Sequence, residues 1–170
     1  VQNQAERVFN QSYDKLKDAA GRLRRAAENI TNGVPISNQP IDFGETPYIL
    51  QKLGAKALPL EMRDPKKLLQ IGKSEGQRED GHGLSAEVLS QIPYALHDPL
   101  AVFASATHEN ALVVVTELKD GKGNPVITAV HLNVSAKNHQ INKVASIYGR
   151  SNAKTAFVAW EKDGKLLYVN

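Results

Sequence analysis

The chain has no cysteine among its 170 residues. This absence excludes disulfide bonds, cysteine nucleophiles and thiolate metal sites. It does not determine the compartment, because a secreted protein that acts in another cell's reducing cytosol would also function without cysteine. The sequence lacks any apolar run of membrane-spanning length, and no signal peptide opens it. We therefore expect no membrane span.

Methionine is almost absent as well. The first residue is Val1, and Met62 is the only methionine. We therefore expect a fragment cut from a longer protein or a processed product. The apolar fraction of 41% is sufficient for a real core, and the length suits one domain with an appended segment.

Carboxylates are missing from one long segment. Between His131 and Trp160 the chain has two histidines and four lysines or arginines, but no Asp or Glu. The whole chain is only mildly basic, with a net charge of +3. A surface of this kind suits a polyanion, and RNA is the leading candidate. The alternative is a sheet edge whose lysines are simply solvated.

Apolar residues near the N-terminus recur at alternating spacings of four and three, from Phe9 to Ile30. This repeat predicts a helix over residues 4–31, which packs either on its own domain or on another helix or the parent protein. Residues 33–47, rich in proline and glycine, are predicted to be a linker. We divide the chain into a helical segment and linker, 1–40, and a domain, 41–170.

The rest of the chain follows helical patterns first and strand patterns afterwards. Residues 152–161 are ambiguous, although their aromatic residues fit one helix face. Helices followed by antiparallel strands predict an α+β domain, with helices packed on an antiparallel sheet of about four to five strands. We expect helices at 47–53, 65–73 and 85–91, and strands at 58–62, 100–105, 111–118, 126–134, 141–148 and 166–169.

Two of the five histidines are candidates for proton transfer. His82 lies between two glycines directly before a predicted helix, where the helix N-terminus favours an anion such as a phosphodiester. His131 lies with Asn133 at one edge of a predicted strand, and Glu117 is a candidate neighbour. Each histidine also has a simpler interpretation, His82 as a loop residue and His131 as a half-buried one.

The other three histidines carry weaker signals. His97 is expected to end a helix, and His108 and His139 are expected in loops. No metal-ligand motif, phosphate-binding loop, dinucleotide fingerprint or serine-hydrolase motif occurs in the sequence. We therefore expect no metal and no cofactor.

RNA can be cut without a cofactor, because its 2′-hydroxyl can attack the adjacent phosphate. His82 is the candidate base or acid, with His131 as a further catalytic candidate. Arg150 has the planar guanidinium to bind the phosphate, and Tyr148 can stack on a base or donate a hydrogen bond. The candidate RNA-binding residues are the other polar or basic groups of the same segment: Lys137, Lys143, Ser146, Asn152 and Lys154.

Several short motifs follow one another along residues 44–170. They are Glu45-Thr-Pro47, Leu58-Pro-Leu60, His82-Gly-Leu-Ser85, Ile92-Pro93, Asp98-Pro99-Leu-Ala-Val-Phe103, Val113–Thr116-Glu117-Leu118, Ser146-Ile-Tyr148-Gly-Arg150 and Leu166-Leu-Tyr168. Their order resembles the C-terminal domain of phage MuF-type head morphogenesis proteins.

This resemblance implies membership of the barnase–EndoU–colicin–RelE-like nuclease superfamily and a curved antiparallel sheet. It implies a metal-independent ribonuclease at the C-terminus of a larger secreted or delivered effector, acting in the target-cell cytoplasm. His82 and the polar end of Ser146–Arg150 would form its active site. A toxin of this class requires a cognate immunity protein, and the basic surface predicts an acidic one.

Two other functions stay open. One is a non-catalytic module, either an RNA-binding domain or a structural part of a phage or secretion system. The other is an ADP-ribosyltransferase-type toxin, although the Arg, Ser-Thr-Ser and Glu-x-Glu series of those enzymes is not evident in this sequence.

Overall fold

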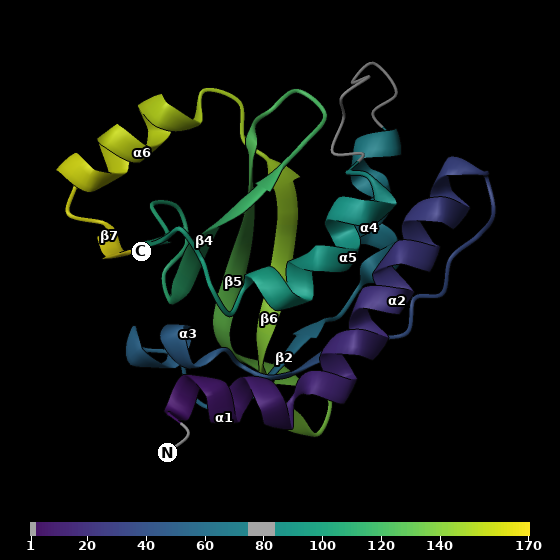
Figure 1. Cartoon of the computed structure of the whole chain (residues 1–170), viewed down its shortest axis with the longest axis horizontal. Helices are drawn as coiled ribbons and strands as arrows, with labels where there is room; N and C mark the ends of the chain where they lie inside the picture. The colour runs from purple at the N-terminus through teal and green to yellow at the C-terminus, as the bar shows by residue number, and fades with distance from the viewer. Residues whose placement is uncertain (1–2, 75–83) are drawn as a thin grey trace.

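The computed structural model describes residues 3–74 and 84–170, which form helices packed on a seven-stranded sheet (Figure 1). The strands lie in the order β1-β2-β6-β5-β4-β3-β7. Their bounds are β1 Ile41–Glu45, β2 Pro59–Met62, β3 Ala101–Ala104, β4 Ala111–Lys119, β5 Pro125–Ala136, β6 His139–Gly149 and β7 Leu166–Val169. The helices are α1 Gln4–Gln11, α2 Tyr13–Thr31, α3 Tyr48–Lys52, α4 Pro65–Ser74, α5 Ala86–Ala95 and α6 Ala153–Lys162.

The predicted α+β class is confirmed, but the predicted number of strands was too small. The sheet is also mixed, because β2 and β6 run parallel while the other neighbours are antiparallel. Strands β2, β3 and β7 lie in ranges predicted as strands, whereas β1 was not predicted, because a short strand carries a weak alternation signal. The ambiguous residues after Arg150 form helix α6, and Ser85 caps α5, accepting a hydrogen bond from the Val88 N–H.

The N-terminal helix pattern is confirmed as α1 and α2, which are separated at the buried Ser12. Helix α2 packs on α5 and on β1, and its Ala19, Leu23 and Ala27 join the main core. The helical segment therefore packs on the rest of this chain. Arg24 joins the two helices at their polar edge, donating to the Glu87 carboxylate at 2.8 Å and to the Ser90 hydroxyl at 3.1 Å.

The predicted linker contains strand β1. Its Ile41 and Phe43 are almost fully buried and alternate with Asp42, which is the period of a half-buried strand. The strand is only five residues long and holds Gly44 at a φ of +84°, where the register with β2 shifts. The strand was not predicted, because its segment contains proline and glycine and its apolar pattern is short.

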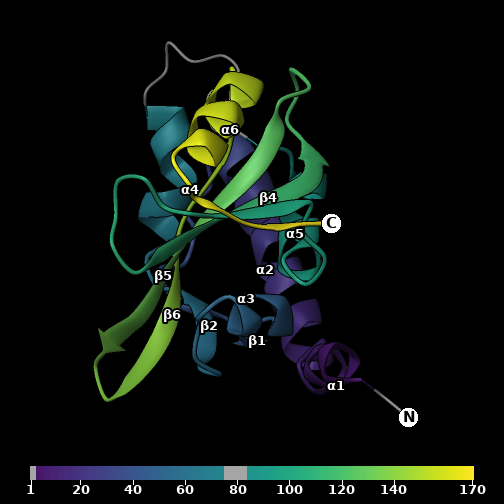
Figure 2. The ribbon, with the colours of Figure 1, turned by 90° about the vertical axis from the view of Figure 1, so that its left-hand side faces the viewer.

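The two faces of the sheet are covered differently (Figure 1). Helices α2 and α5 pack on the face that carries Val114, Val130 and Val144. The opposite face is covered at one end by α6, whose Phe157 and Trp160 pack against strands β3, β4 and β5. Figure 2 shows α6 across one end of the sheet, while the β5–β6 hairpin extends away from it. No helix of the described residues is both long and apolar enough to span a membrane.

Candidate functional site

A row of paired residues crosses four neighbouring strands on the α6 side of the sheet. Ala111 of β4 lies opposite His131 of β5, His131 opposite Lys143 of β6, and Lys143 opposite Glu61 of β2. Directly paired residues project from the same face of a sheet. With neighbouring strands about 4.8 Å apart, the row places Lys143 midway between His131 and Glu61, which are separated by roughly 10 Å.

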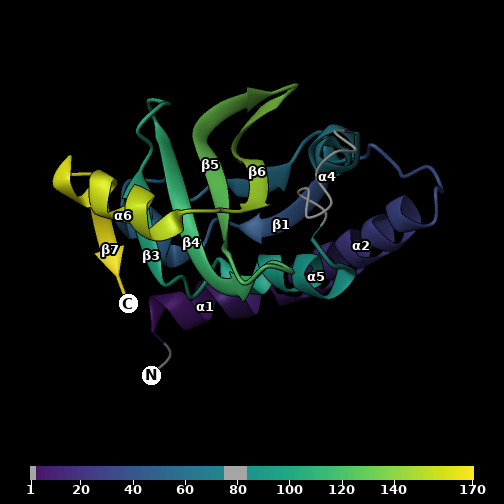
Figure 3. The same cartoon turned by 90° about the horizontal axis from the view of Figure 1, so that it is seen from above.

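The strand pairing also shows which face of the sheet carries the row. Four residues from Ala111 and His131, the pair Val115 and Ile127 packs under α6 together with Tyr148. An even number of residues along a strand returns to the same face. The row therefore lies on the α6 side, beyond the end that the helix covers, where the curved β5–β6 hairpin extends (Figure 3). His131 and Lys143 are both partly exposed.

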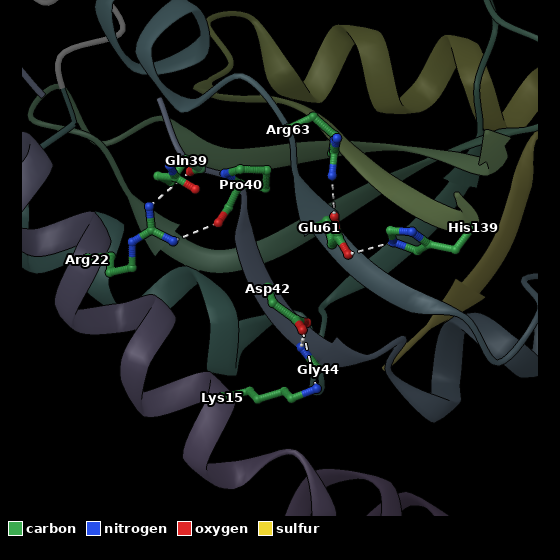
Figure 4. Close-up of polar contacts among 9 residues, drawn as sticks. All are labelled: Lys15, Arg22, Gln39, Pro40, Asp42, Gly44, Glu61, Arg63 and His139. Atoms are coloured by element: carbon green, nitrogen blue, oxygen red, sulfur yellow. Dashed lines mark hydrogen bonds and ion pairs between the residues drawn. The ribbon is translucent and has the colours of Figure 1, made fainter. Parts of the chain in front are cut away.

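Glu61, at one end of this row, contacts both a histidine and an arginine (Figure 4). The residue Glu61 is 8% exposed; its Oε1 accepts from Arg63 Nη1 at 3.0 Å, and its Oε2 lies 3.2 Å from His139 Nε2. Because the Glu61 carboxylate is paired with Arg63, it can only accept hydrogen bonds. His139 therefore donates to it from Nε2, and its Nδ1 stays available to a ligand. The His139 side chain is 48% exposed. We call Glu61, Arg63 and His139 the Glu61 cluster.

A pair of imidazoles lies at the other end of the row. His108 stacks on His131 with ring centroids 4.1 Å apart and an interplanar angle of 17°. Desolvation lowers the pKa of His131, and the neighbouring His108 and Lys143 lower it further. His131 is therefore neutral at physiological pH and can accept a proton. The Ser105 hydroxyl holds the turn that carries His108 by accepting the N–H of His108 at 3.1 Å.

The residues predicted at the Gly149 end of β6 are separate from this row. Arg150 lies over the Trp160 ring of α6 at 5.2 Å from its centroid, and its buried Nε has no hydrogen-bond partner among the residues that the structure describes. Asn152 is left-handed and exposed just before α6, and Lys154 is exposed on that helix. Seven residues of strand separate Arg150 from Lys143, a distance of roughly 20 Å.

The remaining predicted residues also follow β6. Tyr148 lies at the α6 end, and Ser146 lies opposite Ala129 beside an irregularity in the strand. Lys137 is exposed in the turn between β5 and β6. The structure therefore brings together His131 and Lys143 from the predicted set and distributes the described others over β6, the turn before it and the start of α6.

The structure tests two of the sequence-based expectations about histidines and leaves a third outside the residues that it describes. His131 lies on β5 and Glu117 on the neighbouring strand β4, as expected, but Glu117 is six residues from Ala111, the residue opposite His131. His139 belongs to β6 and not to a loop. His82 lies outside the described residues.

Glu61 and Arg63 were not predicted as site residues from the sequence. Their spacing of two residues across the end of a predicted strand was a usable signal, since it places both on one face. The partner of Glu61 was not readable, because His139 is 78 residues away in the sequence. In the described part of the chain, no group of three or more His, Cys, Asp or Glu could hold a metal ion.

The fold and the site define an α+β protein whose half-covered sheet carries a row with a histidine, a lysine and a glutamate, and two further histidines beside it. Residues 73–170, more than half of the chain, match the family described as the phage MuF C-terminal domain. The chain belongs to this family. No curated protein and no solved structure matches it.

Only part of the site lies within the residues that match the family. Strands β3 to β7 lie within this match, with His108, His131, His139 and Lys143. Glu61 and Arg63 lie outside it, on the N-terminal part of the chain. The Glu61 cluster is therefore assembled from the family region and from the segment that precedes it.

Proposed function

We propose that this chain is a metal-independent endoribonuclease of the barnase–EndoU–colicin–RelE-like superfamily. The observation that carries the proposal is the row itself: the basic Lys143 lies between a neutral His131 and Glu61, and the Glu61 carboxylate orients His139. A proton acceptor, a cation and a proton donor in that order are what RNA transesterification requires.

In this mechanism His131 takes the proton of the ribose 2′-hydroxyl, and the 2′-oxygen forms a bond to phosphorus. Lys143 stabilises the negative charge that develops on the phosphoryl oxygens. The bond from phosphorus to the 5′-oxygen breaks as His139 gives its Nδ1 proton to that oxygen, and the Glu61 carboxylate balances the charge of the doubly protonated imidazole. The products are a 2′,3′-cyclic phosphate and a free 5′-hydroxyl.

The biological setting belongs to the same proposal. We infer that the domain is delivered into a target cell by a larger phage-related carrier and cuts RNA in the cytoplasm, with transfer RNA as one candidate. An acidic immunity protein would then protect the producing cell by covering the basic site. Arg150, Asn152 and Lys154, at the far end of β6, would bind the RNA away from the cut.

The test is cleavage of total bacterial RNA in the presence of EDTA, with analysis of the new ends. We expect cyclic phosphate ends, and we expect His131→Ala and His139→Ala each to lower the rate by a factor on the order of 10² to 10⁴. Lys143→Met should lower it as well. Lys17→Ala, on the exposed side of α2 at the opposite face of the sheet, is the matched charge control.

The other outcomes would each contradict the proposal in a different way. RNA that is retained but not cut indicates a binding module. Cells killed by the domain while their RNA stays intact would direct attention to transferase chemistry. Cleavage that persists in both histidine variants would place catalysis elsewhere in the chain.

A further inference from the structure

An open polar cleft adjoins the Glu61 cluster. It has a volume of about 550 Å³ and is lined by residues 37–40, Arg63, Asp64 and Lys137. Arg63 belongs to both places, since it lines the cleft and donates to Glu61 at 3.0 Å. The cleft therefore begins where the Glu61 cluster ends.

The wall formed by residues 37–40 is held from both sides. Arg22 of α2 donates to the backbone carbonyls of Pro40 at 2.7 Å and Gln39 at 2.9 Å (Figure 4). On the other side, the Asn38 side-chain oxygen accepts the Lys66 N–H at the start of α4 at 3.0 Å. A segment without regular structure is thus positioned before any ligand arrives, which reduces the entropy lost on binding.

The chemistry of the lining matches one unit of a nucleic acid strand. Arg63 and Lys137 supply positive charge for a phosphate, whereas the Asp64 carboxylate repels phosphate and accepts hydrogen bonds from a base or ribose. Ser37, Asn38 and Gln39 add neutral polar groups for the same purpose. A volume of this size lies in the range of small-molecule sites, and it cannot accept a duplex.

We propose that this cleft is a subsite for one nucleotide of single-stranded RNA, a few nucleotides along the strand from the phosphate that is cut. The proposal rests on the ribonuclease function. It gives a role to Lys137, which lies in the β5–β6 turn about 20 Å along β6 from Lys143 by strand rise. The RNA strand would run from the His131–Lys143 row past the Glu61 cluster into the cleft.

The experiment measures binding of a 2′-O-methyl oligoribonucleotide, which has no 2′-hydroxyl to attack and stays intact. Fluorescence anisotropy at several salt concentrations gives the affinity and its salt dependence. We expect Lys137→Ala to weaken binding by roughly three- to tenfold and to lower the slope of log K against log salt by about 0.7, the value for one lost phosphate contact on a single strand. Lys17→Ala should leave both quantities unchanged.

The outcomes separate the subsite from the ribonuclease function. If Lys137→Ala binds the oligonucleotide like the parent chain while natural RNA is still cut, the subsite is wrong and the ribonuclease stands. If Lys137→Ala loses affinity but the parent chain cuts no RNA, the subsite is supported and the ribonuclease is wrong. A charge reversal, Lys137→Glu, should enlarge any effect on binding, and its failure to do so would contradict the subsite.

Discussion

His97 illustrates how burial changes a histidine that has no place in the site. It packs edge-on against Phe9, with ring centroids 5.2 Å apart, close to Tyr94 at the end of α5. Desolvation lowers its pKa to about 4. His131 is shifted in the same direction, but its neighbours are a cation and a second imidazole on an exposed strand face. Of these two histidines, His131 is the one that combines a proton-accepting state with access to a ligand.

The pKa of His97 gives a prediction about stability. The unfolded chain binds a proton at this histidine below about pH 6.5, whereas the folded chain does so only near pH 4, so acid favours unfolding in this interval. We expect His97 to remove about 1.4 kcal/mol from the free energy of unfolding between pH 7.5 and 5.5. Urea unfolding of the parent chain and of His97→Leu at both pH values measures this contribution.

The stability of His97→Leu should fall less over this interval, since leucine takes up no proton. An equal fall in both proteins would mean that other groups cause the pH dependence.

At the scale of the elements, the parallel pair of β2 and β6 assembles the site. Only two pairs are in register, Leu60 with Asn142 and Glu61 with Lys143. Asn142 is fully buried; its Nδ2 donates to Thr46 Oγ1 at 2.7 Å and to the Lys56 carbonyl at 3.0 Å, and its Oδ1 accepts the Asn133 N–H at 2.9 Å. This side chain ties β6 to β5 and to the chain that leads into β2.

We therefore predict that Asn142→Ala destabilises the fold by about 3 kcal/mol, because it leaves buried polar partners unsatisfied. Gln140→Ala is the matched control, since this amide is exposed on the same strand and donates only to the Ser135 hydroxyl. Its cost should stay below about 0.5 kcal/mol. Chemical denaturation of the two variants gives the comparison, and similar midpoints would contradict the role assigned to Asn142.

Most elements were predictable from the sequence because their patterns are local. The long strands β4, β5 and β6 alternate or carry β-branched runs, and α2 has a regular apolar repeat. Strand β1 was missed because its five residues include Gly44, and the parallel pairing of β2 was missed because nothing local encodes a partner strand. Within the site, the type of residue was readable at His131 and Lys143, whereas their neighbours were not.

At the scale of the whole molecule, the N-terminal helices complete the core on which the family region rests. Leu23 of α2 is fully buried in the main cluster, together with Leu89 and Ile92 of α5. β1 and β2 extend the sheet beside β6, and they bring Glu61 to the site. The segment before the family match thus contributes to both the core and the site.

This arrangement predicts that a chain beginning at residue 41 does not fold. Removing α2 would expose apolar surface of α5 and β1 and leave no cover for the core. Leu23→Ala should be the milder version, with a loss of about 3 kcal/mol. Circular dichroism and two-dimensional NMR of the shortened chain provide the measurement; a cooperative thermal transition and dispersed spectra at 41–170 would contradict the prediction.

The sequence by itself determined the helical N-terminal segment, the long strands, the basic and carboxylate-free face of the hairpin, and the resemblance to the phage MuF family. These properties depend on local periodicity, charge and short motifs, which a chain displays before it folds. The tertiary structure decided that Glu61 meets His139, that Lys143 lies between Glu61 and His131, and that residues 37–40 form one wall of a cleft. The physical reason is that strand pairing brings together residues up to 82 positions apart, and no local pattern records which strands will pair.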